Sequence, residues 1–401
     1  MATQPTGNAV IGQSGGPTAV INQSLVGVIE ELRKTNHVNR LLGARHGVRG
    51  IVDERFIELN DVPDELLARI AKTPAAALGS TRDKPDQTYC ERIFRSFAKN
   101  DVRYFFYIGG NDSADTARIV NDLAKAEGYP LQTFHIPKTI DNDLRVHDHT
   151  PGYGSAARWV ACAIRGDNFD NKSLPGIKVD IIMGRHAGFL TAASVLARHR
   201  DDDGPHLIYV PEAPVSEDKF LADVDAMYKK HGRCLIACSE GITAPDGRTW
   251  FEKRAEAHER DSHGNLQLSG SGELGDYMAE LIKSRLGTKL RIRADTFGYV
   301  QRSFPLQSET DAQEARLVGQ VAARESREPG SSGSVAMRRV GSGDYQIETF
   351  LTPLHTVAKE TKHMEDRYIE NGNNITQAFI DYASPIVGKL PEVGTFDELT
   401  R

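Results

Sequence analysis

The chain has 401 residues, more than one ordinary hydrophobic core accommodates, so we expect two domains. Hydrophobic residues make up 39% and charged residues 26%, as in globular proteins, and the net charge of -6 provides no general basic surface for nucleic acid. Without an apolar run of ~20 residues, a signal-like start or enough clustered cysteines for a disulfide framework, the sequence predicts a cytoplasmic protein with no membrane partner.

Short apolar runs alternate along the chain with longer segments of helical pattern. The predicted strands cover residues 9–11, 104–108, 132–136, 179–183, 207–210 and 235–237. The predicted helices cover about residues 19–34, 113–127, 155–165 and 187–198. The repeated order of strand, tight turn and helix predicts an α/β fold with parallel sheets and helical crossovers. Ligands of such sheets bind beyond the carboxyl ends of the strands.

Two short stretches favour structural roles. Cys234 and Cys238 flank the apolar run 235–237, so we expect buried strand thiols rather than a metal site. The run Asp201-Asp202-Asp203 is typical of a solvated turn.

An acidic stretch, Pro137-Lys-Thr-Ile-Asp-Asn-Asp143, follows the apolar run 132–136. One carboxylate there can accept a proton from a substrate hydroxyl, a second can approach a divalent cation, and the ammonium of Lys138 can face a phosphate. Phosphoryl transfer uses such groups, because positioning and charge neutralisation supply most of its catalysis. In isolation, Asp-Asn-Asp is more often a turn held by side-chain-to-backbone hydrogen bonds.

Two glycine turns precede predicted helices. Gly12-Gln-Ser-Gly-Gly-Pro-Thr18 lets backbone amides approach an anion at a helix start, although it lacks the lysine of a P-loop and the spacing of a dinucleotide fingerprint. It is equally typical of a plain tight turn. In Gly109-Gly-Asn-Asp-Ser-Ala-Asp115, Asp112 either caps the helix or faces a metal or a phosphate.

Later motifs add an arginine and sugar-binding groups. Met183-Gly184-Arg185 ends a strand with a guanidinium that can stabilise a transferring phosphoryl group, although most such arginines form surface ion pairs. Glu240 can accept hydrogen bonds from sugar hydroxyls. The residues suited to a sugar phosphate are Arg293, Tyr299 and Arg302. Each of these residues alone is more often a surface or ion-pairing residue.

Together and in order, from Gly12 to about Arg302, these motifs resemble the phosphofructokinase family. They comprise the first Gly-Gly turn, Gly79-Ser-Thr-Arg82, Gly-Gly-Asn-Asp, Lys-Thr-Ile-Asp-Asn-Asp, Met-Gly-Arg, Glu-Gly and Tyr-Val-Gln-Arg. The resemblance implies two Rossmann-like lobes with the active site in the cleft between them. It assigns residues 1–152 and 304–355 to a lobe for the phosphoryl donor and Mg²⁺. Residues 153–303 and 356–401 form the fructose 6-phosphate lobe.

The resemblance also implies residue roles. Asp141 becomes the base for the 1-hydroxyl of fructose 6-phosphate, with Asp112, Lys138 and Arg185 as further catalytic residues. The sugar-phosphate site comprises Thr139, Ile140, Asp141, Met183, Gly184, Arg185, Glu240, Arg293, Tyr299 and Arg302. The donor site comprises Gly15, Arg82 and Lys138, and the Mg²⁺ site Asp112, Asn111 and Asp143. Arg293 is expected to reach a neighbouring subunit of a homodimer or homotetramer.

The donor follows from two residues within this resemblance. ATP-using members typically have glycine where this chain has Asp112 and Lys138. A carboxylate at 112 opposes the ATP α-phosphate, and an ammonium at 138 favours the phosphate that leaves diphosphate, so we expect a diphosphate-dependent enzyme of glycolysis or gluconeogenesis. Asn111 stands where many members have an aspartate, which leaves its direct ligation of Mg²⁺ open.

Three alternatives remain. They are an ATP-dependent phosphofructokinase, a non-catalytic sugar-phosphate-binding regulatory subunit, and a nucleotide-dependent oxidoreductase. The intact Asp141, Asp143 and Arg185 disfavour the regulatory subunit, and the glycine spacing disfavours the oxidoreductase.

Overall fold

The computed structural model describes residues 4–255, 272–287, 289–341, 344–358, 361–396 and 399. The chain divides into two compact units. Unit 1 comprises Met1–Ala156 and Tyr299–His363, and unit 2 comprises Ala157–Gly298 and Met364–Arg401. The chain therefore crosses between the units at three places. Within the described ranges, no helix combines the length and the apolar character needed to span a membrane.

Unit 1 contains a seven-stranded sheet in the order β11-β10-β5-β4-β1-β2-β3. Its strands are β1 (Gly7–Gln13), β2 (Val38–Ala44), β3 (Phe56–Glu58), β4 (Val102–Gly109), β5 (Gln132–Pro137), β10 (Gly333–Arg339) and β11 (Ile347–Thr352). Neighbouring strands from β10 to β2 are parallel, whereas the edge strands β3 and β11 pair antiparallel. The predicted parallel sheet is confirmed, with antiparallel edges that no sequence signal indicated.

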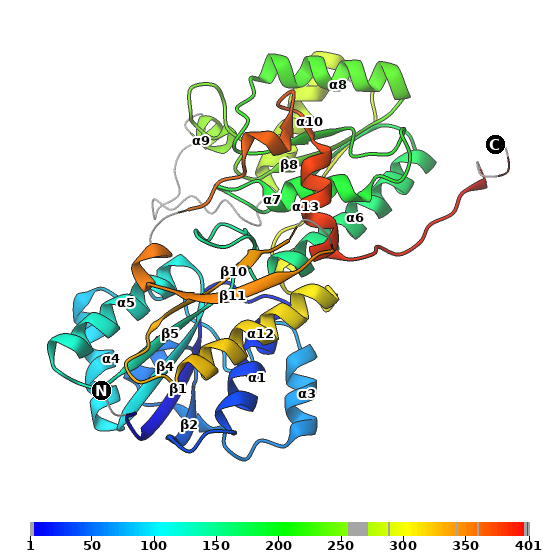
Figure 1. Ribbon diagram of the computed structural model, residues 1–401. Coiled ribbons are helices and arrows are strands. Elements are labelled where there is room, and N and C mark those ends of the chain that lie inside the picture. The colour runs from blue at the N-terminus through cyan, green and yellow to red at the C-terminus, as the bar shows by residue number, and fades with distance from the viewer. Residues whose placement is uncertain are drawn as a thin grey trace. The chain divides into compact units, whose positions relative to one another are not determined.

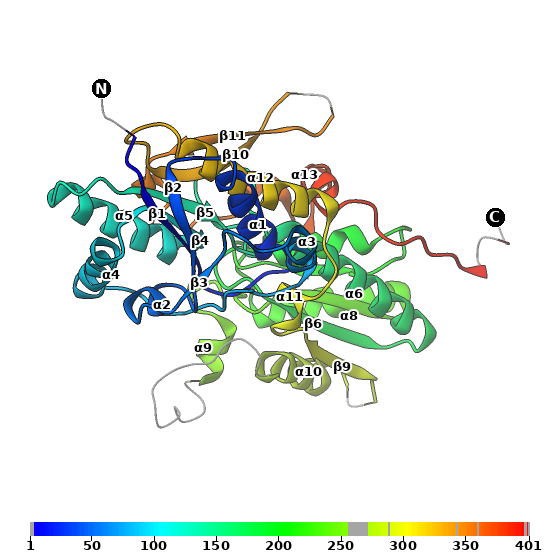
Figure 2. The same cartoon turned by 90° about the horizontal axis from the view of Figure 1, so that it is seen from below.

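The core of unit 1 has two layers because strand residues alternate between the faces of the sheet. On β4, Phe106 packs beneath α1 (Ile21–Leu32), α3 (Asp64–Lys72) and α12 (Glu309–Glu325). Its neighbour Phe105 packs on the opposite side with α2 (Val48–Val52), α4 (Gln87–Lys99) and α5 (Asn111–Ala126). Figures 1 and 2 show these helix layers on opposite faces of the sheet. Helical crossovers on both faces leave the carboxyl ends of the strands for ligands.

Unit 2 contains a four-stranded parallel sheet in the order β7-β8-β6-β9. Its strands are β6 (Ile177–Ile182), β7 (Leu207–Tyr209), β8 (Cys234–Ser239) and β9 (Ile292–Thr296). Phe220 of α8 (Glu217–His231) and Met278 of α10 (Glu273–Leu286) pack against these strands. Cys234 and Cys238 are fully buried on β8, which confirms the predicted strand thiols.

Other elements connect and cover the sheets. The helices are α6 (Tyr153–Ser173), α7 (Phe189–Ala192), α9 (Trp250–Ala255), α11 (Val300–Ser303) and α13 (Gln377–Val387), with 3₁₀ helices η1 (Ala193–Ala197), η2 (Leu354–Thr356) and η3 (Asp366–Tyr368). A small antiparallel pair joins β12 (Ile369–Glu370) and β13 (Asn374–Ile375). The boundary between the units falls within the first turn of α6.

All six predicted strands and all four predicted helices are present, with shifted ends. The helix predicted over 187–198 is divided between α7 and η1. The solvated turn predicted at residues 201–203 is wrong for Asp203, which is 5% exposed. This carboxylate accepts hydrogen bonds from the backbone of His199 and Arg200 and from Asn168, and pairs with Lys172. The buried side chain of Asp203 therefore stabilises the turn through these hydrogen bonds and the ion pair.

Candidate functional site

The glycine turn between β1 and α1 lies among three cationic side chains. Gly15 has φ +73°, a left-handed conformation that suits glycine, and its N–H donates to Thr81 O at 2.9 Å. A Cβ added at residue 15 would lie 3.1 Å from Lys138 Nζ. One added at Gly16 would lie 3.1 Å from Arg302 Nη1 and 3.7 Å from Arg82 Nη2. The absence of side chains at the two glycines therefore lets these cations converge.

The convergence shifts the ionisation of Lys138. Its side chain is 4% exposed, and Nζ donates to Gly16 O at 2.7 Å. Burial lowers the pKa of Lys138 to about 8; Asp141 opposes this shift, while Arg302 and Arg82 reinforce it. Burial, followed by the charge of Arg82, also lowers the pKa of Arg302. A bound anion would relieve this repulsion, so the cluster has the electrostatics of a phosphate site.

The acidic loop, residues 138–149, runs from the end of β5 beside this cluster. The N–H of Asp141 donates to Thr139 Oγ1 at 3.1 Å, and Asn142 takes a left-handed φ of +58°. Burial raises the pKa of Asp143, against a hydrogen bond from Thr139 and the charge of Lys138. The structure thus brings Gly15, Arg82, Lys138, Asp141 and Arg302 together, as the sequence predicted for the donor and acceptor groups.

A small cavity lies next to the glycine turn in unit 1. Its volume is about 90 Å³, far below the roughly 300–1,000 Å³ of pockets for drug-sized ligands. Its lining residues are Ser14, Gly15, Thr81, Arg82, Asp83, Lys84, Tyr107, Asp112, Ser113 and Thr116. The walls carry both signs of charge, since Arg82 and Lys84 lie beside Asp83 and Asp112.

Asp112 lies in the first turn of α5, where the helix dipole favours a carboxylate. It pairs with Lys84 at 3.0 Å between Oδ2 and Nζ, and its side chain remains 65% exposed. The sequence analysis did not select Lys84, although it follows the Gly-Ser-Thr-Arg motif by two residues. Asn111 begins the same helix. Both oxygen-bearing side chains therefore lie at one helix start.

The predicted site residues of unit 2 lie at the carboxyl ends of β6 and β8. Gly184 has φ +130°, and its carbonyl accepts a hydrogen bond from Ser239 Oγ at 2.6 Å. Arg185 Nε lies 3.6 Å from Glu240 Oε1. A Cβ at Gly241 would lie only 2.0 Å from Arg185 O, so this glycine permits the close approach of the two strand ends. Met183 is half-buried beside them.

The remaining predicted residues divide between the units. Arg293 is exposed on β9, the edge strand of the unit 2 sheet. Tyr299 belongs to unit 1, and the guanidinium carbon of Arg302 lies 4.5 Å from the centre of its ring. This stacking orients the arginine beside the glycine turn. Ile140 is 6% exposed in the acidic loop.

Unit 2 also contains a carboxylate cluster that the sequence analysis did not identify. Oxygens of Asp167, Asp180 and Asp295 lie within 4.8 Å of one another. Lys178 Nζ lies 2.7 Å from Asp167 and 3.1 Å from Asp295, so an ammonium already neutralises two of the three. Asp180 is fully buried, with no hydrogen-bond donor to its oxygens in the part of the chain described. Burial, followed by the charge of Asp167, raises its pKa well above the ordinary value.

This shift gives the stability of the protein a pH dependence. The folded state retains a proton on Asp180 that the unfolded chain releases above pH about 4, so stability falls as pH rises from there to the folded pKa. Asparagine lacks this dependence. We expect the stability of Asp180→Asn relative to wild type to increase as pH rises above about 4, by up to about 1.4 kcal/mol per pH unit, in urea unfolding. A difference between Asp180→Asn and wild type that stays constant as pH rises contradicts the assignment. Asp201→Asn, at an exposed position, is the control for the substitution itself.

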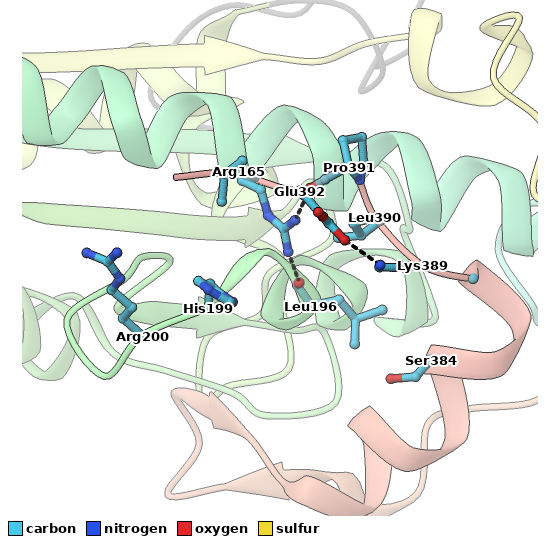
Figure 3. A pocket seen from close by; sticks show the side chains of 11 residues that line it. Arg165, Leu196, His199, Arg200, Ser384, Lys389, Leu390, Pro391 and Glu392 are labelled. Carbon is cyan, nitrogen blue, oxygen red and sulfur yellow. Dashed lines mark hydrogen bonds and ion pairs between the residues drawn. The ribbon is translucent and has the colours of Figure 1, made fainter. Parts of the chain in front are cut away.

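A larger cavity in unit 2, of about 850 Å³, contains none of the predicted site residues. Figure 3 shows Arg165 of α6, which donates to the carbonyl of Pro391 in the segment after α13 and to the carbonyl of Leu196 in η1. Lys389 and Glu392 form an ion pair on the same wall. The two hydrogen bonds of Arg165 therefore join α6 to η1 and to the segment after α13.

Comparisons with known proteins give a consistent result. Residues 8–324 match the family model described as Phosphofructokinase. The chain is 50% identical to the pyrophosphate–fructose 6-phosphate 1-phosphotransferase of Rhodospirillum rubrum, over 96% of this chain and 95% of that protein. It is 37% identical to the Xanthomonas campestris protein of the same name, over 96% and 93%. A crystal structure of pyrophosphate-dependent phosphofructokinase from Nitrosospira multiformis superposes with a TM-score of 0.84 and 33% identity, covering 97% of this chain and 94% of that one.

Proposed function

The chain belongs to the phosphofructokinase family, and we propose that it transfers a phosphoryl group from diphosphate to the 1-hydroxyl of D-fructose 6-phosphate. The products are fructose 1,6-bisphosphate and phosphate. The reaction breaks the phosphoanhydride bond of diphosphate, releases phosphate as the leaving group and forms a phosphate ester of the sugar. In this proposal the reaction is reversible. It can therefore serve glycolysis or gluconeogenesis in the cytoplasm.

The observation that carries the proposal is the convergence of Arg82, Lys138 and Arg302 on a side-chain-free turn beside Asp141. Arg82 and Lys138 supply positive charge for diphosphate at this turn, and Arg302 supplies it for the sugar phosphate. The small cavity of unit 1 adjoins the turn and is lined in part by Gly15 and Arg82. In this proposal Asp141 accepts the hydroxyl proton, the sugar oxygen attacks phosphorus, and the bridging P–O bond breaks. The departing phosphate is stabilised by Lys138. A binding-only subunit has no need of such a base.

The other proposed roles follow the family motif. Arg185 stabilises the transferring phosphoryl group, as guanidinium donors match phosphate oxygens. The sugar phosphate is bound by Thr139, Ile140, Met183, Gly184, Glu240, Arg293, Tyr299 and Arg302. The assignment of the donor to residues 1–152 and 304–355, and of the sugar to residues 153–303 and 356–401, is part of the same proposal.

A phosphotransferase generally uses a divalent metal, and we propose Mg²⁺ held by Asp112 and Asp143 with a contribution from Asn111. These three residues suit a magnesium ion, because their side chains all offer the oxygen ligands that Mg²⁺ prefers. Asp143 is half-buried with a raised pKa, a cost that a nearby cation relieves. When bound, the ion neutralises charge on the transferring phosphates.

Self-association is also proposed. Arg293 is exposed on the edge strand β9, where its guanidinium donates to Ile292 O at 3.1 Å. This exposure supports the role of reaching a sugar phosphate in a neighbouring copy of a homodimer or homotetramer. Sedimentation of the purified chain, followed by Arg293→Ala kinetics, tests this.

The donor is tested by assaying the purified chain with fructose 6-phosphate and Mg²⁺, with either diphosphate or ATP. We expect turnover with diphosphate and little with ATP, because Asp112 repels the α-phosphate region of a nucleotide. Equal or better turnover with ATP refutes the proposed donor. Lack of turnover with both donors refutes the enzyme itself.

Asp112→Gly is expected to raise the ratio of kcat/KM for ATP to that for diphosphate at least about fivefold. Like charges 4 Å apart cost about 1 kcal/mol even in water, which corresponds to that factor. Asp112→Asn is the matched control, since it removes charge but keeps size. If neither variant changes the donor ratio, Asp112 does not select the donor.

A further inference from the structure

Lys362, which no sequence motif singled out, contacts the acidic loop at three backbone carbonyls. Its N–H donates to Asp143 O at 2.7 Å. Its ammonium donates to His147 O at 3.1 Å and to Asp148 O at 2.8 Å. Hydrogen bonds from a charged donor are roughly twice as strong as neutral ones. A residue more than 200 positions later in the chain therefore holds both halves of this loop.

The chain around Lys362 supports the same loop through packing. Thr361 forms an antiparallel bridge with Leu144, the residue after Asp143. The side chain of Leu144 is fully buried in a cluster with Ala114, Val357 and Ala358. Ala114 lies two residues after Asp112 in α5. Residues 357–358 and 361–362 thus contact the loop that carries Asp141 and Asp143 and the helix start that carries Asp112.

The acidic loop needs such support because it has little regular structure of its own. Between the end of β5 at Pro137 and the start of α6 at Tyr153 the chain forms turns and two isolated bridges, Thr139–Gly152 and Leu144–Thr361. Asn142 is left-handed, and its side chain accepts a hydrogen bond from the Thr150 N–H at 3.1 Å. Such connections tolerate movement unless other segments fix them. Movement of about 1 Å in a reacting group costs up to about 10²-fold in rate.

We propose that Lys362 is a positioning residue of the phosphoryl transfer: its backbone and ammonium fix the acidic loop so that Asp141 and Asp143 face the reactants. It acts through the loop carbonyls, without touching the substrate. The inference rests on the proposed function, because the role of the loop does. Lys362, which lies outside the family motifs, thereby joins the residues that determine the rate of phosphoryl transfer.

The test replaces Lys362 by methionine, which removes the ammonium but keeps the backbone N–H and an unbranched side chain of similar length. We expect kcat to fall about 10- to 100-fold, with the KM for fructose 6-phosphate within about twofold of wild type. Lys362→Arg retains the charge and is expected to recover part of kcat. Amide hydrogen exchange is expected to accelerate in residues 141–150 while the urea midpoint stays near that of wild type.

The control is Lys229→Met, which removes an exposed ammonium paired with Asp225 on α8 and is expected to leave kcat unchanged. Wild-type kcat in Lys362→Met overturns the inference, as does a loss of kcat accompanied by an equal loss in the control. Arginine performing no better than methionine also overturns it, because the charge is then not what fixes the loop. Wild-type turnover is measured first, so that its absence refutes the proposed function and leaves these outcomes distinct.

Discussion

Asp141→Asn is expected to lower kcat by about 10²- to 10⁴-fold, the usual contribution of a positioned general base. The amide keeps the shape of the carboxylate and the backbone hydrogen bond to Thr139 Oγ1. It cannot accept the proton of the sugar hydroxyl. Binding of fructose 6-phosphate is expected to change little, because the change removes a proton acceptor and no cation. A coupled assay and a calorimetric titration with the sugar phosphate measure the two quantities.

The control for this variant is Asp61→Asn, an exposed residue in the turn after β3. A kcat within about tenfold of wild type in Asp141→Asn means that another group serves as the base. Equal losses in sugar binding and in turnover instead identify Asp141 as a binding residue.

Lys138→Met is expected to lower kcat/KM for diphosphate by about 10²- to 10³-fold, the cost of removing one preorganised donor from a developing anion. The side chain is 4% exposed and its ammonium lies at the glycine turn, so little water replaces it. Methionine fills a similar volume without the charge. Folding is not expected to suffer, since the substitution removes a buried cation that lies near two guanidinium groups.

The pH dependence provides a separate check on Lys138. Because its pKa in the free protein is lowered to about 8, the cation is present below that pH and lost above it. The kcat/KM for diphosphate in wild type is therefore expected to fall as pH rises through about 8, since this ratio reports the free enzyme. Lys138→Met is expected to lack that descending limb. If the limb persists unchanged in the variant, it belongs to another group.

The two predictions test different parts of one arrangement. Asp141 opposes the lowering of the pKa of Lys138, while Arg82 and Arg302 reinforce it. The site thus holds a base and an electrophilic cation close together, with an excess of positive charge. A bound anion neutralises that excess of positive charge. We therefore expect the donor to bind where Lys138, Arg82 and Arg302 repel one another in the free protein.

The short apolar runs predicted the strands that carry the acidic loop and the Met-Gly-Arg motif, but not β9, which carries Arg293. The run at 132–136 is β5, and the run at 179–183 is β6, because a strand buried on both faces reads as a continuous apolar segment. Edge strands such as β3 and β11 have partly exposed, mixed patterns, and no such signal marked them. The sequence also did not show that the helix predicted at 187–198 divides into α7 and η1, because an α-helix and a 3₁₀ helix both place apolar residues on one side.

The sequence by itself determined the α/β class and the family motifs, from which we propose the groups that carry phosphoryl transfer. The fold class and the motifs depend on local patterns, because a glycine turn at a strand end or an acidic residue after a buried strand can be recognised from a few neighbouring residues. Only the tertiary structure decided that Arg82, Lys138 and Arg302 converge on Gly15 and Gly16, and that Lys362 holds the acidic loop. Such contacts join residues that are far apart in the sequence, by 122 positions for Lys138 and Gly16 and by 214 for Lys362 and Asp148, and their geometry, burial and pKa shifts exist only in the folded chain.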